Sequence, residues 1–125
     1  MGVHMKPEDV LERLLDFATR VGAVVDALPE TRLGRHIAGQ LVRCGTSSLP
    51  NYEEACAAES RADFIHKIGV SLKEMRESRS WLRLITRSKQ LPPRRPEPLL
   101  DEATQLCNIL GKTVLTAKNN RRKTA

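Results

Sequence analysis

The 125-residue sequence has only four aromatic side chains: Phe17, Tyr52, Phe64 and Trp81. It also has no apolar run that approaches the roughly 18–20 residues needed to span a membrane. No apolar stretch follows a basic one near its N-terminus, as a signal peptide requires. These absences predict a cytoplasmic protein with a core built from aliphatic side chains.

Motifs of catalysis and metal binding are equally scarce. The three cysteines form no Cys-x-x-Cys pair, which argues against a disulfide framework and a tetrathiolate zinc site. The chain contains neither a glycine-rich phosphate loop nor a Gly-x-Ser-x-Gly elbow. Its histidines and cysteines lack the i, i+3 or i, i+4 spacing of helical metal sites. We therefore expect no enzyme, no catalytic residue, no metal and no cofactor.

The chain length predicts one domain, since domains commonly hold roughly 100–200 residues. We assign the domain to residues 6–120. Residues 1–5 (Met-Gly-Val-His-Met) resemble a cloning remnant and are left out of the fold prediction. The basic stretch from Asn119 onward, and residues 121–125 in particular, is predicted to be a frayed tail.

Apolar residues at spacings of three and four predict three clear helices. The first begins at Pro7 and is ended by Pro29. The second clear helix begins with a capping box at Ser60 and continues to about Lys89. Residues 90–98 hold four prolines and predict a linker, before a last helix that starts near Glu97. No segment alternates as a strand does, so we expect an all-α, antiparallel up-down bundle.

The segment between the first helix and Ser60 allows two interpretations. Thr31 is a suitable cap for a helix, but Pro50 removes a backbone hydrogen bond in the middle of the segment. The segment forms either two helices with a turn between them, or one long helix kinked at Pro50. In the second case the hydroxyls of residues 46–48 could satisfy the freed carbonyl groups. Helix propensity alone slightly favours two helices.

The net charge of +6 is concentrated in one part of the chain, because residues 60–96 hold ten basic and three acidic residues. Projected on a helix, a group of these forms a stripe, which favours an interface with phosphates. The alternative is a solvated face that Glu74, Glu77 and acids of the first helix neutralise. No aromatic residue interleaves with the stripe, so any nucleic-acid binding should be weakly selective. The stripe consists of Lys73, Arg76, Arg79, Arg83 and Arg87.

Three apolar residues of the same helix project well away from the centre of its core face: Val70, Trp81 and Leu84. An apolar patch outside the core is typical of a subunit interface. The alternative is that Trp81 packs at the rim of a monomeric bundle. We favour the interface.

Three runs, residues 44–55, 59–69 and 72–84, resemble the four helix bundle protein family. This family is also called the S23 or 23S rRNA intervening-sequence protein family. The resemblance rests on the patterns Ser-x-x-x-Asn-Tyr-x-Glu-Ala, which ends at Ala55, and Lys-Glu-x-x-Glu-x-x-x-Trp-Leu, which begins at Lys73. It implies an antiparallel four-helix bundle in which the second helix is long and kinked near Pro50. Pro50 departs from the Ala or Gly of many members, while Asn51 and Tyr52 have structural roles.

The resemblance also implies a homopentamer without enzymatic activity. Related accessory proteins of diversity-generating retroelements bind nucleic acid and a protein partner through basic surfaces. We therefore expect a non-enzymatic homo-oligomer that binds RNA or DNA weakly and has a possible protein partner. The first alternative is a protein–protein assembly module without nucleic-acid binding, and the second is a small bundle enzyme or metal carrier.

Overall fold

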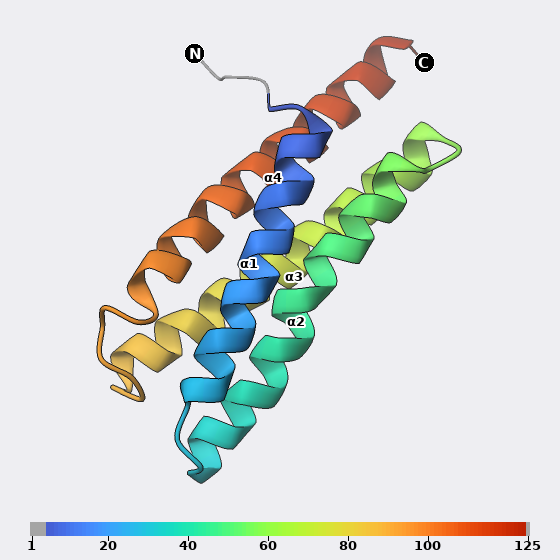
Figure 1. The fold of residues 1–125 in the computed structure, drawn as a ribbon. Coiled ribbons are helices and arrows are strands. Elements are labelled where there is room, and N and C mark those ends of the chain that lie inside the picture. The colour runs from blue at the N-terminus through green and yellow to red at the C-terminus, as the bar shows by residue number, and fades with distance from the viewer. Residues whose placement is uncertain (1–4, 125) are drawn as a thin grey trace.

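The computed structural model describes residues 5–124, and its side chains as far as Asn120. It contains four helices: α1 (Pro7–Ala27), α2 (Arg32–Cys56), α3 (Arg61–Arg87) and α4 (Glu97–Thr124). Consecutive helices run in opposite directions, so that α1 begins at the end of the bundle where α4 finishes (Figure 1). The described residues contain no strand. The predicted all-α, antiparallel four-helix bundle is confirmed.

Helix α1 follows its sequence signals closely. Pro7 occupies its first turn, and Glu8 and Asp9 lie where the positive end of the helix dipole favours acidic side chains. The helix ends at Ala27, because Leu28 adopts the extended backbone that a following proline favours. Six apolar residues at spacings of three and four are buried along α1 and just after it: Val10, Leu14, Phe17, Val21, Val24 and Leu28.

Helix α2 is one continuous helix with Pro50 inside it, so the alternative of two helices with a turn is wrong. The Thr31 hydroxyl caps its start and accepts a hydrogen bond from the Gly34 amide at 3.0 Å. Near the proline, the Asn51 side-chain amide donates to the Ser47 carbonyl at 2.8 Å. The hydroxyls of residues 46 and 47 donate to carbonyl groups one turn earlier, before the carbonyl that Pro50 frees. Packing therefore outweighs the local cost of the proline.

The hairpin ends of α3 and α4 are fixed by local chemistry. The Ser60 hydroxyl accepts from the Asp63 amide at 3.1 Å, which confirms the predicted cap. Helix α3 ends at Arg87, two residues before the predicted end, since Lys89 has a left-handed backbone with φ of 58°. Helix α4 starts at Glu97 with Pro98 in its first turn, where proline is tolerated.

At both ends of the predicted domain, further residues belong to the folded bundle. Helix α4 continues to Thr124, so the basic stretch from Asn119 is helical in the residues described. Arginine and lysine are good helix formers, and they are favoured near a helix C-terminus. Met5 packs against the core although it was excluded from the fold prediction. Residues 1–4 and 125 lie outside the described residues.

One core joins the four helices. Helix α1 packs beside α2 and α4, helix α3 packs beside α2 and α4, and α1 and α3 lie diagonally across the bundle. Arg13 of α1 holds Glu102 of α4 through two hydrogen bonds, of 2.9 and 2.6 Å. Gly45 lets α2 approach α1, because a Cβ there would lie 2.8 Å from the Val21 side chain. None of the four helices is both long and apolar enough to cross a membrane.

Candidate nucleic-acid interface

Helix α3 has one face closed against α2. Two of its acidic residues, Glu74 and Glu77, bind Arg43 of α2, the first at 3.1 Å. Deeper in this contact, the Ser48 and Ser71 hydroxyls lie 2.7 Å apart, and each donates to the backbone carbonyl of the other residue. Glu74 and Glu77 are thus paired with α2 and not with the basic stripe of α3.

The stripe lies on the side of α3 nearer to α4. Lys73, Arg76, Arg83 and Arg87 are exposed, and Arg79 is half-buried. Within residues 5–120, where side chains are described, none of the five forms an ion pair. Burial raises the pKa of the Cys107 thiol in α4, and the positive charges of Arg79 and Arg76 partly offset this increase. The structure therefore brings the predicted stripe together along the α3–α4 seam.

The acids of the first helix do not reach this stripe. Helix α1 holds five acidic and two basic residues, whereas α3 holds seven basic and three acidic residues. Because α1 and α3 lie diagonally in the bundle, their charges face opposite directions. The neutralisation that the solvated-face alternative required from Glu74, Glu77 and α1 is absent from the described contacts. Helix α1 is therefore net acidic and α3 is net basic.

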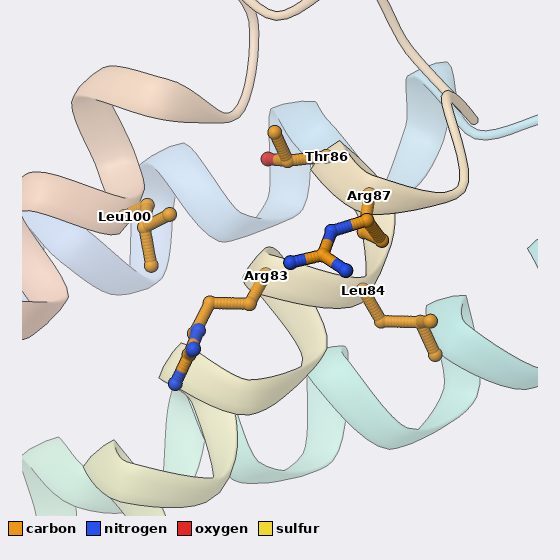
Figure 2. Close-up of a pocket in the computed structure, with 5 residues that line it drawn as sticks. All are labelled: Arg83, Leu84, Thr86, Arg87 and Leu100. Carbon is orange, nitrogen blue, oxygen red and sulfur yellow. The ribbon is translucent and has the colours of Figure 1, made fainter.

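A pocket of about 340 Å³ lies at the C-terminal end of the stripe, between α3 and α4. Its lining residues are Arg83, Leu84, Thr86, Arg87 and Leu100. Figure 2 shows both guanidinium groups extending from α3 on the side that faces Leu100 of α4. The Thr86 hydroxyl donates to the Leu82 carbonyl at 3.1 Å, so its lone pairs remain available to accept a hydrogen bond.

A larger groove of about 1270 Å³ lies toward the opposite end of the bundle. It runs between the C-terminal half of α4 and the α2–α3 hairpin, with Tyr52, Phe64, Cys107 and Leu115 among its lining residues. Arg76 of the stripe also borders it. Burial, together with the neighbouring Cys56, raises the pKa of Tyr52 to about 12. The stripe thus extends from this groove to the pocket at Arg83 and Arg87.

Comparison with known proteins identifies the family. Residues 6–112 match the family model of the 23S rRNA-intervening sequence protein. The chain belongs to this family. A crystal structure of a protein of unknown function from the S23 ribosomal protein family of Bacteroides thetaiotaomicron superposes with a TM-score of 0.80. That protein is 32% identical, and the alignment covers 88% of this chain and 98% of the other.

None of the curated proteins matches the chain. The matched family and the similar crystal structure, which is of a protein of unknown function, do not indicate an enzyme. Among the residues described, no three His, Cys, Asp or Glu side chains gather into a group that could hold a metal ion.

The expected oligomer face of this family member is partly used within the chain. The Trp81 ring meets His36 of α2 edge-on, with ring centroids 5.6 Å apart, and its Nε1 donates to Glu77 at 3.4 Å. Trp81 and Leu84 are half-buried and pack against the core, while Val70 is half-buried. The predicted face therefore flanks the α2–α3 seam and leaves part of each side chain uncovered.

Sequence reasoning missed the residues that complete the pocket. Thr86 could have been found, because it lies three residues after Arg83 and so shares its side of α3. Leu100 could not, since it belongs to another helix and its place depends on how the α3–α4 loop folds. Arg43 also carried no signal, because its partners lie 31 and 34 residues away.

Proposed function

We propose that this protein is a non-enzymatic, homo-oligomeric bundle that binds RNA or DNA weakly and without sequence specificity through the stripe of α3. One observation carries the proposal. Five basic side chains follow one another along α3 without an acidic partner among the described residues, while Glu74 and Glu77 of the same helix are held by Arg43. Solubility alone does not require the basic residues of a helix to be separated from its acidic residues in this way.

The dimensions of the stripe suit a phosphate backbone. Its ends, Lys73 and Arg87, are 14 positions apart, which corresponds to ~21 Å along a helix. Each phosphate that a basic side chain neutralises releases counterions, so binding weakens as salt rises. No aromatic residue lies within the stripe. Along most of its length the stripe therefore contacts phosphates and does not recognise the bases. The affinity should therefore be electrostatic and the same for different sequences.

The names of the similar proteins agree with an RNA context. The matched family is named for 23S rRNA, and the similar crystal structure is assigned to a ribosomal protein family. Neither name states a binding activity, so the proposal rests on the charge distribution of α3. The protein partner and the pentamer that the family resemblance implies belong to the same proposal.

Binding of a fluorescein-labelled 20-nucleotide RNA, measured by anisotropy between 50 and 200 mM salt, tests the proposal. With five phosphate contacts, the slope of log K against log salt should lie between about −3.5 and −4.5. Replacing Arg76, Arg83 and Arg87 with glutamine should make the slope less steep by about one unit for each residue. Several unrelated sequences should give the same affinity.

A matched control removes three charges elsewhere. The triple variant Arg32→Gln, Arg35→Gln, Lys118→Gln loses the same charge from exposed positions outside the stripe. We expect it to keep at least two thirds of the slope. Equal losses in both triple variants would mean that net charge alone matters. Undetectable binding at 50 mM salt would contradict the proposal and favour an assembly module that contacts only proteins.

A further inference from the structure

We propose that the pocket between α3 and α4 holds one unpaired nucleobase, so that the protein prefers single-stranded nucleic acid to a duplex. This inference rests on the proposed function, because the strand must already lie along the stripe. The pocket occupies the stripe's C-terminal end, where Arg83 and Arg87 serve as both stripe residues and pocket walls. A strand bound by its phosphates would thus pass over the pocket opening.

The pocket walls have the chemistry that a base requires. A guanidinium group is planar and stacks on flat π-systems, which makes arginine an alternative to the aromatic platform that the stripe lacks. Arg83 and Arg87 are one helical turn apart, and neither has an ion pair among the described side chains. Leu100 supplies apolar contact, and the Thr86 hydroxyl can accept a hydrogen bond from an exocyclic amine.

The size and openness of the pocket suit a tethered group better than a free ligand. Its volume of about 340 Å³ is at the lower end of the range of ligand pockets, which is roughly 300–1,000 Å³. A free nucleotide would bury little of its surface there. A base carried by a strand on the stripe enters at a high effective concentration, so that even a small pocket contributes to affinity.

The pocket is preformed by the loop that joins its two walls. After Arg87 the chain turns through Lys89, and the proline-rich segment folds back with the Arg95 amide bound to the Pro92 carbonyl at 2.9 Å. The Glu97 amide binds the Pro93 carbonyl at 3.0 Å, at the start of α4. These turns fix Leu100 opposite the arginines, and a preformed site loses less entropy on binding.

A duplex cannot use this pocket without cost. Its bases are stacked and paired, and turning one outward costs a few kcal/mol. Electrostatics alone gives the opposite preference, because a duplex carries more charge per unit length and has the steeper salt dependence. A preference for the single strand would therefore report on the base and not on the phosphates.

The test compares three fluorescein-labelled DNA probes of twelve nucleotides at 50 mM salt: an oligo-dA strand, the same strand in a duplex, and a strand of abasic sites. We expect the oligo-dA strand to bind at least about fivefold more tightly than either of the others, which is the lower limit of stacking per base. Leu100→Gln and Thr86→Leu should each reduce this preference to about twofold or less with an unchanged salt slope. The first removes an apolar wall, and the second removes the acceptor hydroxyl and narrows the pocket.

Leu15→Gln is the matched control, because Leu15 is an exposed leucine of α1, the helix that lies diagonally across the bundle from α3. It should keep the full preference, and circular dichroism should show that all three variants fold. Equal binding of the three probes by the wild type would overturn the pocket proposal while leaving the stripe intact. Loss of all binding, or binding without salt dependence, would overturn the proposed function itself.

Discussion

The two sides of α3 differ in how their polar residues are used. Toward α2, polar groups face one another: Ser48 binds Ser71, and the Ser78 hydroxyl lies 3.2 Å from the Cys44 sulfur. Toward α4, the basic side chains have no acidic partner among the described residues, and both cavities open there. The α2–α3 seam therefore holds the bundle together, whereas the α3–α4 seam carries the charge that remains free for a ligand.

The largest stability effect should come from enlarging a buried serine in the α2–α3 seam. Ser71→Leu adds two heavy atoms where the Ser48 hydroxyl now lies 2.7 Å away, and it removes the donor to the Ser48 carbonyl. Overpacking and the lost hydrogen bonds should together lower the free energy of unfolding by about 2–4 kcal/mol. Urea unfolding followed by circular dichroism measures this change.

Thr86→Leu also replaces a hydroxyl-bearing side chain with leucine, on the α4 side of the same helix. The new side chain would extend into the open pocket, so we expect the free energy of unfolding to change by no more than about 0.5 kcal/mol. If Thr86→Leu were as harmful as Ser71→Leu, the two seams would be equally close-packed. The contrast between a closed and an open side of α3 would then be lost.

A smaller effect should separate two arginines that the sequence alone does not distinguish. Arg43→Gln removes the charge partner of the buried Glu74 and of Glu77, and should lower Tm by a few degrees. Half of the Arg43 side chain is exposed, so solvent screening limits the loss. Differential scanning calorimetry at low and high salt measures it, and added salt should reduce the difference from wild type.

Arg79→Gln is the counterpart on the α4 side. It should leave Tm within about one degree of wild type, because no acidic side chain described in the structure depends on Arg79. It should instead make the salt slope of RNA binding about one unit less steep. A stable, fully binding Arg79→Gln protein would remove Arg79 from the stripe. An Arg43→Gln protein that loses RNA affinity would show that the basic surface crosses to α2.

The fold was predictable because its signals are local and repeated. The spacing of Val10, Leu14 and Phe17 places them on one face, and the caps at Thr31 and Ser60 act within one turn. The continuity of α2 through Pro50 was not predictable from propensity, because the packing of a buried turn on α3 decides it. The family resemblance supplied that result, since it carries the outcome of tertiary packing that propensity omits.

The candidate site was predictable only in part, for the same physical reason. All five residues of the stripe lie on one helix, so their common side follows from the helical repeat. Whether acids neutralise that side depends on neighbours from other helices, and the pairing of Glu74 with Arg43 crosses 31 positions. The pocket also depends on the α3–α4 loop, which places Leu100 opposite Arg83. Such contacts have no sequence period.

The smallest stability change is expected for the oligomer face beside the closed seam. We infer that Val70, Trp81 and Leu84 contact further copies of the chain, and Val70→Glu tests this with little effect on the monomer because Val70 is only half-buried. Native mass spectrometry should give the mass of five chains for the wild type and of one chain for Val70→Glu. Trp81→Asp should act in the same direction, although it also loses the contact with His36.

If both variants kept the wild-type mass, the assembly would use another surface. A monomeric wild type would mean that both sides of α3 serve the single chain. Retention of RNA affinity by monomeric Val70→Glu would show that the α3–α4 side binds without the assembly, as its separation from the α2 side requires.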